Sequence, residues 1–242
     1  MPEREDVRFD AGGQEMGGHL YRPAEPQGSV VVVPSVHGCN DYVADVSRAL
    51  AARGYEAMTV DIYSRGDHPG DLSTPDRIQS AVAALPDDRV TADVVAAGQY
   101  LRDRDGGKVA VLGFCVGGLY AFRAAASDVF AAAIDFYGMI RYAPAIAASK
   151  AQEPVELAGD LQAPLLGHFG TLDPWCPAEH VAELRDRLSE HGKPHEIYDY
   201  PGAGHAFHEF HRPQVYRAVA AADAWRRTLG FLDYHLAGHA AL

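Results

Sequence analysis

The sequence predicts an α/β fold in which a mostly parallel, doubly wound sheet carries helices on both faces. Short β-branched runs alternate with longer segments of helical periodicity along nearly the whole chain, which is the pattern of parallel strands joined by helical crossovers. The run at 29–35 is apolar without alternation, as expected for a strand buried on both faces. No repeat, linker or low-complexity tract divides the 242 residues, so we expect one domain spanning 1–242.

The elements of the first half follow from turn residues and hydrophobic spacing. Segments 4–10 and 18–22 predict two strands, and the glycines at 12 and 13 between them favour a hairpin. The strand at 29–35 is followed by a helix at 41–53 that stops at Gly54, and then by a strand at 55–61. Segment 64–88 is rich in Gly, Pro, Asp and Ser. We expect it to form a lid with a short helix at 75–85.

The second half continues the alternation. Helices are predicted at 91–104, 119–127, 178–191 and 214–236, and strands at 109–112, 131–137, 163–169 and 195–200. Segment 141–161 is rich in alanine and is expected to be irregular. In a doubly wound sheet the ligand binds at the carboxyl ends of the strands, so the loops that follow the strands are where chemistry is expected.

The strand at 109–112 leads into Gly113-Phe-Cys115-Val-Gly117, a G-x-nucleophile-x-G pattern with cysteine in the central position. A strand that turns sharply into a helix strains its middle residue, and a Cβ two positions away would clash. The turn would present the Cys115 sulfur above the sheet and aim the amides of the new helix at it. The alternative is a strand, turn and helix that contain a buried structural cysteine.

Three polar residues follow three predicted strands in the order nucleophile, acid, histidine. They are Cys115, Asp173 and His205, and this is the order of the α/β-hydrolases. A thiol nucleophile needs a base, and a carboxylate on the other ring nitrogen fixes the tautomer of that base. A single Asp or His after a strand is more often a cap or a solvated loop residue. Three in this order at three strand ends predict a catalytic triad.

An acyl-transfer site also needs donors for the oxyanion. The amide of Val116, directly after the nucleophile, is expected to supply one of them. The second is expected from the loop after the strand at 29–35, where Val36 and His37 are both candidates. Loss of one such donor typically costs about 2.7–4 kcal/mol in the transition state.

Composition narrows the class of protein. The formal net charge is −12 and no cluster of Lys and Arg interrupts it, so nucleic acid is not expected as a partner. The odd number of cysteines, three, argues against a disulfide framework and for a reducing compartment. The amino-terminal residues are charged, and no stretch approaches 18 apolar residues. We therefore expect a cytoplasmic protein without a membrane partner.

A metal site is not expected. Cys39 and Cys176 fall in loops beside the presumed mouth of the site and could be drawn together with Cys115 and nearby histidines. However, the spacings contain neither a Cys-x-x-Cys nor a His-x-x-x-His clamp.

These residues resemble the dienelactone hydrolase family of α/β-hydrolases, and the resemblance covers most of the chain. The segments that carry it are Gly113-Phe-Cys-Val-Gly-Gly118, Val60-Asp-Ile-Tyr-Ser-Arg65, Asp135-Phe-Tyr-Gly138, His168-Phe-Gly-Thr-Leu-Asp173 and Gly202-Ala-Gly-His-Ala-Phe207. The resemblance implies a single-domain α/β-hydrolase that hydrolyses lactones or enol esters through an acyl-thioenzyme, without metal or organic cofactor. Our leading hypothesis is a cysteine hydrolase of a small lactone, ester or thioester. It assigns the triad to Cys115, Asp173 and His205, and the oxyanion amides to Val36 and Val116.

Two positions depart from the well-studied members of that family. Those members have a glutamate beside the nucleophile where this chain has Ser35, which leaves His205 as the partner of Cys115 and makes His37 a second polar candidate. They also have a substrate-binding arginine shortly after the catalytic histidine, where this chain has Glu209. The residues expected to contact substrate are Ser35, His37, Arg77, Tyr137, Phe207, His208 and Glu209.

These departures keep two other functions open. A biosynthetic cyclase, isomerase or acyl transferase would use the same triad, and a water-excluding apolar lid would favour it over hydrolysis. A non-catalytic ligand-binding relative is the third hypothesis. In each case the expected partner is a small molecule, and the protein is expected to be a monomer or a small homo-oligomer.

Overall fold

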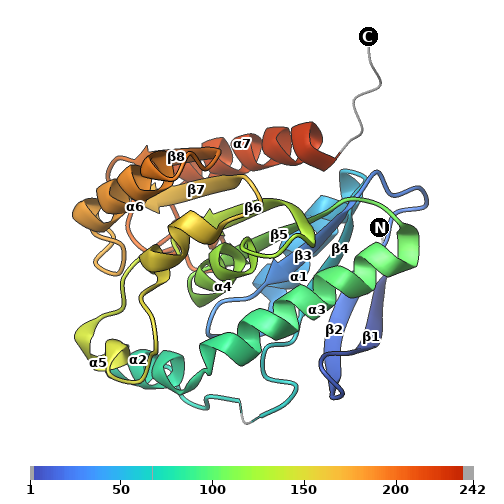
Figure 1. Ribbon diagram of the computed structural model, residues 1–242, viewed down its shortest axis with the longest axis horizontal. Helices are drawn as coiled ribbons and strands as arrows, with labels where there is room; N and C mark the ends of the chain where they lie inside the picture. The colour runs from blue at the N-terminus through green and yellow to red at the C-terminus, as the bar shows by residue number, and fades with distance from the viewer. Residues whose placement is uncertain (1–2, 67, 237–242) are drawn as a thin grey trace.

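Eight strands form one sheet in the order β1-β2-β4-β3-β5-β6-β7-β8, shown in Figure 1. They are β1 (Arg4–Asp10), β2 (Glu15–Tyr21), β3 (Ser29–Val33), β4 (Glu56–Val60), β5 (Val109–Phe114), β6 (Phe130–Phe136), β7 (Leu165–Gly170) and β8 (His195–Tyr200). The computed structural model describes residues 3–66 and 68–236. β2 pairs antiparallel with β1 and with β4, and all other neighbours are parallel. The prediction of a mostly parallel α/β sheet is confirmed.

Helices cover both faces of the sheet. They are α1 (Asp41–Ala52), α2 (Pro75–Ala84), α3 (Asp87–Asp105), α4 (Val116–Ala124), α5 (Pro144–Ala147), α6 (Ala178–Glu190) and α7 (Ala218–Leu236), with a 3₁₀ segment η1 (Pro154–Asp160). β3 shows how the two faces are covered. Val30 and Val32 pack in one core with α1 and α7, whereas Val31 and Val33 pack in the other with α3, α4 and α6. Because both faces are buried, β3 is continuously apolar.

The largest differences between predicted and observed element boundaries are at β2, which begins at Glu15 instead of 18, and at three helices. α4 begins at Val116 instead of 119, because the glycines at 117 and 118 are required by close packing although they are poor helix formers. α3 begins at Asp87 instead of 91, and two aspartates in its first turn complement the positive end of the helix. α7 begins at Ala218 instead of 214. The segment 141–161, predicted to be irregular, contains α5 and η1.

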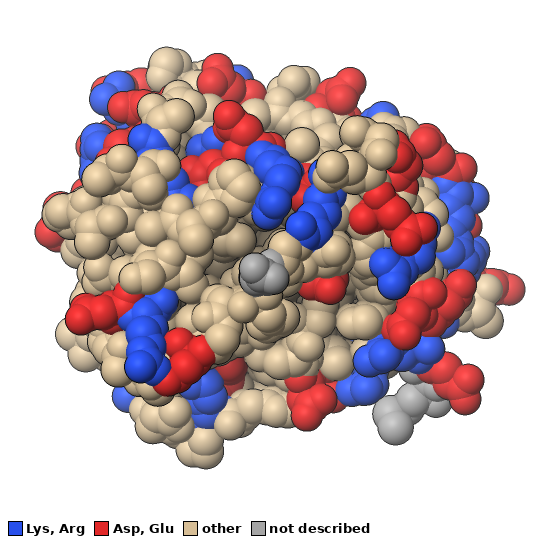
Figure 2. All heavy atoms as spheres, turned by 90° about the horizontal axis from the view of Figure 1, so that it is seen from below, with Lys and Arg blue, Asp and Glu red and all other residues tan. Residues whose placement is uncertain are grey.

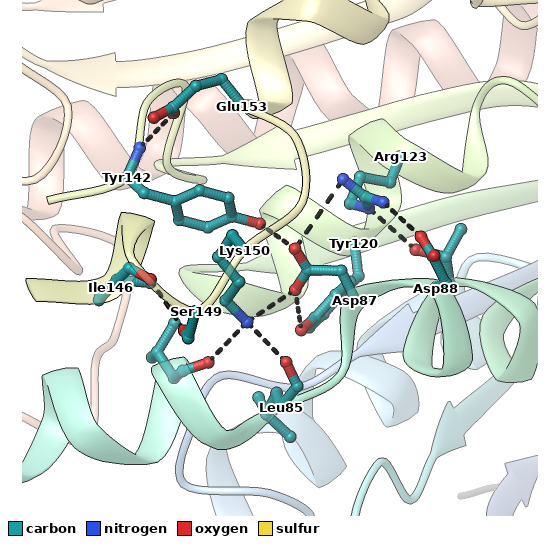
Figure 3. A network of polar contacts seen from close by, with 12 residues as sticks. Leu85, Asp87, Asp88, Tyr120, Arg123, Tyr142, Ile146, Ser149, Lys150 and Glu153 are labelled. Atoms are coloured by element: carbon teal, nitrogen blue, oxygen red, sulfur yellow. Dashed lines mark hydrogen bonds and ion pairs between the residues drawn. The ribbon is translucent and has the colours of Figure 1, made fainter. Parts of the chain in front are cut away.

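A buried ion pair attaches α2 to the body of the protein. Lys150 Nζ donates to Asp87 Oδ1 at 2.9 Å and to the Leu85 carbonyl at 2.5 Å, just beyond the end of α2. Asp87 also accepts hydrogen bonds from Tyr120 Oη at 3.0 Å and Tyr142 Oη at 2.6 Å. Figure 3 shows these side chains converging on the Asp87 carboxylate. The predicted lid helix is therefore held at its carboxyl end by a network of charged and polar groups.

The surface carries interspersed charges. Figure 2, which views the protein from below relative to Figure 1, shows acidic and basic side chains mixed across the face that it displays. Within residues 3–66 and 68–236, no helix combines the length and the apolarity that crossing a membrane requires.

Candidate active site

The turn between β5 and α4 has the strained geometry that the glycine pattern predicts. Cys115 joins strand to helix with φ 58° and ψ −122°. A Cβ on Gly113 would lie 1.9 Å from the Gly117 carbonyl oxygen, and a Cβ on Gly117 would lie 2.3 Å from the Val33 carbonyl oxygen. Only glycine fits at either position. This turn can therefore form only with both flanking glycines, and it places Cys115 at the amino terminus of α4.

Asp173 and His205 form a direct pair. His205 Nδ1 lies 2.8 Å from Asp173 Oδ2, and the second carboxylate oxygen accepts the Trp175 amide at 2.8 Å. Asp173 is buried, whereas the His205 side chain remains 20% exposed. Asp173 follows β7 and His205 follows β8, so both are positioned at the carboxyl edge of the sheet. The carboxylate is therefore fixed by two donors, and it fixes the orientation of the imidazole.

His205 also interacts with Cys115. Burial acts to lower the pKa of His205, but the charge of Cys115 and hydrogen bonds to Asp173, Cys115 and Cys176 outweigh it, so that the pKa of His205 lies well above its ordinary value. A raised pKa favours the imidazolium form beside the Asp173 carboxylate. The residues predicted for the triad are thus brought together.

Strained backbone is concentrated around this site. Among the described residues, three non-glycine residues have positive φ, namely Cys115 at 58°, Tyr137 at 48° and Ala206 at 61°. All three line the same cavity. Such conformations persist only where the surrounding structure imposes them, and they cluster at functional sites. The strain marks the cavity independently of the sequence motifs.

Two backbone amides are available beside the sulfur. Residues 35–38 form a tight turn closed by a hydrogen bond from the Gly38 amide to the Ser35 carbonyl at 2.9 Å. No acceptor in the described part of the chain takes the Val36 amide hydrogen. Val116 is the first residue of α4, where helical amides have no partner within the helix. Both amides predicted as oxyanion donors therefore belong to positions where the fold leaves a donor free.

Cys115 and His205 open into a cavity of about 170 Å³. Its wall combines apolar groups from the lid with polar groups from the loops at the sheet edge. The lining residues are Ser35, Val36, His37, Tyr42, Ile78, Val82, Phe114, Cys115, Tyr137, Met139, Trp175, His205, Ala206, Glu209, Arg212 and Val215. Its volume suits a small molecule.

Four of the residues expected to contact substrate line this cavity, namely Ser35, His37, Tyr137 and Glu209. Glu209 does not present a free negative charge as expected from sequence, because Arg212 Nη1 lies 3.0 Å from its Oε2. The negative charge of Glu209 is thus balanced by the positive charge of Arg212, three residues further along the chain.

Three other residues expected to contact substrate do not line this cavity. Arg77 pairs with Asp71 and lines a separate open hollow of about 880 Å³ that contains neither Cys115 nor His205. Phe207 is fully buried, in contact with Tyr137 and Tyr200. His208 is also buried, because the loop after β8 turns it inward towards α1.

Sequence reasoning missed Arg212 and Tyr42 in the cavity wall. The signal for Arg212 was its spacing of three from Glu209, which favours an ion pair within one turn of chain. Tyr42 lies in the first turn of α1, directly after the loop that contains Val36, and its hydroxyl lies 2.7 Å from His208 Nδ1. No sequence pattern separates this tyrosine from an ordinary core residue.

Cys176 lies beside the same pair. Asp173, Cys176 and His205 each place one potential ligand atom within 4.8 Å of the others. Yet the Cys176 thiol is buried and donates to the carbonyls of Gly138, at 3.1 Å, and Tyr137. Burial raises its pKa strongly, so it remains a neutral thiol, whereas metal ligation requires a thiolate. These contacts support a structural role for Cys176.

The remaining cysteine is also unsuited to nucleophilic attack. Burial raises the pKa of Cys39 to about 12, and its sulfur lies 3.8 Å from the Val60 carbonyl oxygen. It does not line the cavity.

Comparison with known proteins gives one consistent family. Residues 16–236 match the sequence profile of the dienelactone hydrolase family. A Bradyrhizobium protein provisionally named 2-oxo-3-(5-oxofuran-2-ylidene)propanoate lactonase is 40% identical over 96% of this chain and 94% of its own. A protein of Escherichia coli K12 provisionally named carboxymethylenebutenolidase is 35% identical over 90% of this chain and 82% of its own.

A solved structure agrees with these matches. The crystal structure of a provisionally assigned dienelactone hydrolase from Klebsiella pneumoniae superimposes with a TM-score of 0.86 at 30% identity, covering 96% of this chain and 98% of that one.

Proposed function

The chain belongs to the dienelactone hydrolase family and is a hydrolase, and on this premise we propose that it cleaves a small lactone, ester or thioester through a thioester at Cys115. The observation that carries the proposal is the position of this thiol. Cys115 is the one of the three cysteines that lines the cavity, and it shares that cavity with His205, the histidine that Asp173 holds. A cysteine, an oriented imidazole and a buried carboxylate together suit acyl transfer.

In the proposed mechanism Cys115 attacks the carbonyl carbon as a thiolate, while His205 holds the proton as an imidazolium. The tetrahedral intermediate collapses, the carbon–oxygen bond to the leaving group breaks, and His205 donates its proton to that oxygen. A water molecule then loses a proton to His205 and attacks the thioester carbonyl. The second intermediate collapses by breaking its carbon–sulfur bond. This step releases the acid and regenerates the Cys115 thiolate beside the protonated His205. Asp173 stabilises the imidazolium at each stage.

The amides of Val36 and Val116 are proposed to bind the oxyanion of both intermediates. Each is a backbone donor at a position held by the fold, so it needs no reorganisation when the negative charge develops. The tight turn of residues 35–38 and the first turn of α4 are fixed by hydrogen bonds of their own. These features support the assignment of both donors.

We propose that the natural substrate is a small lactone that bears a carboxylate. Arg212 lies in the cavity wall and, although paired with Glu209, its side chain is 40% exposed and has donors to spare. The names of the Bradyrhizobium and Escherichia coli relatives describe lactones with a propanoate or a carboxymethylene group. The cavity of about 170 Å³ is smaller than the roughly 300–1,000 Å³ typical of ligand pockets, which favours a small substrate.

Turnover of an enol lactone and of p-nitrophenyl acetate by the wild type, Cys115→Ala and Cys176→Ala tests the proposal. Intact-protein mass spectrometry during turnover should detect an acyl adduct on the wild type and on Cys176→Ala. Cys115→Ala should lose both the adduct and the turnover. Wild-type rates in Cys115→Ala, or an adduct that maps to Cys176, would overturn the assignment.

A second candidate is acyl transfer to a nucleophile other than water. The lid favours it, because α2 contributes Ile78 and Val82 to the cavity wall and so presents an apolar surface near the sulfur. Product analysis in the presence of added alcohols and amines separates the two. Hydrolysis predicts the free acid as the main product at all practical nucleophile concentrations, whereas transfer predicts that the ester or amide replaces it.

A further inference from the structure

We propose that Tyr63 is a positioning residue that holds the oxyanion turn, residues 35–38, in its active geometry; the inference rests on the proposed function. Tyr63 Oη donates to the Val36 carbonyl oxygen at 2.8 Å, and the side chain is buried. Tyr63 does not line the cavity of Cys115 but the open hollow beside it. It therefore acts on the site through the Val36 backbone rather than by touching substrate.

The bond to Val36 fixes the most variable part of this turn. Ser35 and Gly38 close the turn, which leaves the peptide between Val36 and His37 in the middle. Turn types I and II differ mainly by rotation of this middle peptide, so the closing hydrogen bond alone does not fix its orientation. A donor on the Val36 carbonyl fixes it from one side, and the His37 amide, which donates to Ser35 Oγ at 3.4 Å, restrains it from the other. Since this carbonyl and the free amide belong to the same residue, the bond also restrains the chain that carries the proposed oxyanion donor.

Tyr63 touches the other end of the turn as well. Gly38 has φ 67°, and a Cβ there would lie 3.2 Å from Tyr63 Cδ2 and 3.0 Å from His68 Nε2. The Tyr63 and His68 rings lie with their centroids 4.6 Å apart. Tyr63 therefore bonds to the second residue of the turn through its hydroxyl, and its ring lies close enough to the fourth to crowd any side chain added there.

The segment that carries Tyr63 is itself firmly held. The Tyr63 amide donates to Asp61 Oδ1 at 3.0 Å, and the Gly66 amide donates to the Tyr63 carbonyl at 3.0 Å. Arg65 pairs with the buried Asp93 at 2.8 Å. A side chain mounted on such a segment can restrain its neighbour, because it has little freedom to follow that neighbour's motion.

Tyr63 stays a donor under all working conditions. Burial raises the pKa of its hydroxyl strongly, and the negative charges of Cys115 and Asp61 add to the effect. The single hydroxyl hydrogen is occupied by the Val36 carbonyl, so Tyr63 has no proton to give to a leaving group. Its role is thus distinct from that of a general acid.

The test separates a reaction that needs the oxyanion donors from one that does not. Acylation of Cys115 by p-nitrophenyl acetate passes through an oxyanion, whereas alkylation by iodoacetamide displaces iodide and forms none. In Tyr63→Phe we expect the acylation rate constant to fall about tenfold, less than the 10²–10³-fold loss typical of deleting a donor outright. The alkylation rate constant should stay within about twofold of the wild type. Gly38→Ala, which disturbs the same turn, should show the same split.

Tyr55→Phe is the matched control, because the Tyr55 hydroxyl donates to Asp233 of α7 and Tyr55 does not line the cavity. It should leave both rate constants unchanged. The proposal is overturned if Tyr63→Phe keeps the wild-type acylation rate, or if acylation and alkylation fall by the same factor. Failure of the proposed function gives a different result, namely wild-type protein without an acyl adduct at Cys115.

Discussion

Arg212 Nη1 lies 3.0 Å from Glu209 Oε2, and both side chains line the cavity that contains Cys115. An acidic residue that would repel an anionic substrate is thereby neutralised by an arginine in the wall of the same cavity. The charge character of the cavity depends on this pair and not on either residue alone.

Replacing Arg212 with Gln should raise KM for a carboxylate-bearing lactone by about 10- to 100-fold, the range of a charge-assisted hydrogen bond. The unpaired Glu209 would add repulsion. For p-nitrophenyl acetate, which has no charge, KM should stay within about twofold. Steady-state kinetics with both substrates checks this, with Arg226→Gln as the control because Arg226 pairs with Asp223 on exposed α7. An equal rise of KM for both substrates would contradict the assignment.

Asp173→Asn should lower kcat by about 10²–10⁴-fold with little change in KM, because the amide no longer fixes the tautomer of His205 or stabilises its charge. Single-turnover acylation rates measure the effect directly. Asp128→Asn, at an exposed position, is the control. A loss smaller than tenfold would show that the carboxylate is dispensable.

Two buried histidines predict how stability depends on pH. Burial lowers the pKa of His168 to about 3 and that of His208 to about 4. In the unfolded chain both titrate near 6.5, so between about pH 6.5 and pH 4 the unfolded state binds more protons than the folded state. Their contribution to stability is therefore present above pH 6.5 and is lost as the pH falls.

The change to test is His208→Gln, which keeps a hydrogen-bonding group beside Tyr42. It should reduce the loss of unfolding free energy between about pH 6.5 and 4.5 by about 2 kcal/mol relative to the wild type. Urea denaturation at the two pH values measures it. His191→Gln, at an exposed histidine, should leave the loss unchanged. If His208→Gln lost as much unfolding free energy as the wild type over this pH range, His208 would not contribute to the pH dependence of stability.

Lys150→Met should destabilise the protein by about 3 kcal/mol, because it leaves the buried Asp87 with only the more distant Arg123 guanidinium, at 4.0 Å, as a cation. Since Lys150 also holds the carbonyls of Val82 and Leu85, KM should rise as the lid helix loosens. Urea denaturation and steady-state kinetics check both parts. Lys108→Met, at an exposed lysine with one backbone acceptor, should cost less than about 0.5 kcal/mol. Unchanged stability in Lys150→Met would contradict the role of the pair.

The parts of this site that were predictable from sequence are those fixed by the sheet. Cys115, Asp173 and His205 each lie within five residues of the end of a parallel strand, so their meeting at one edge follows from the strand order. Gly113 is explained by a clash with the Gly117 carbonyl four residues along the chain, whereas Gly117 is required by the Val33 carbonyl on β3. The glycine pattern is visible in the local sequence, although the reason for Gly117 is a contact between distant segments.

The rest depends on how loops fold over the sheet edge. Phe207 and His208 are close to His205 in sequence, but the chain turns both into the core, while Arg212 further along returns to the cavity. Tyr63 belongs to the segment 60–65, which resembles the family. Its hydrogen bond to Val36, however, joins the loop after β4 to the loop after β3. Such contacts are set by tertiary packing, and periodicity does not report them.

The positive φ angles of Cys115, Tyr137 and Ala206 have a consequence for protein engineering. A screen for heat resistance alone selects substitutions that relieve backbone strain. Substitutions at residues 137 and 206 would relieve it without changing the nucleophile. We expect the variants recovered there to be more robust and slower, because the same torsions set the walls of the cavity. Thermostable versions should instead be sought away from the carboxyl edge of the sheet, where stability and turnover do not compete for the same residues.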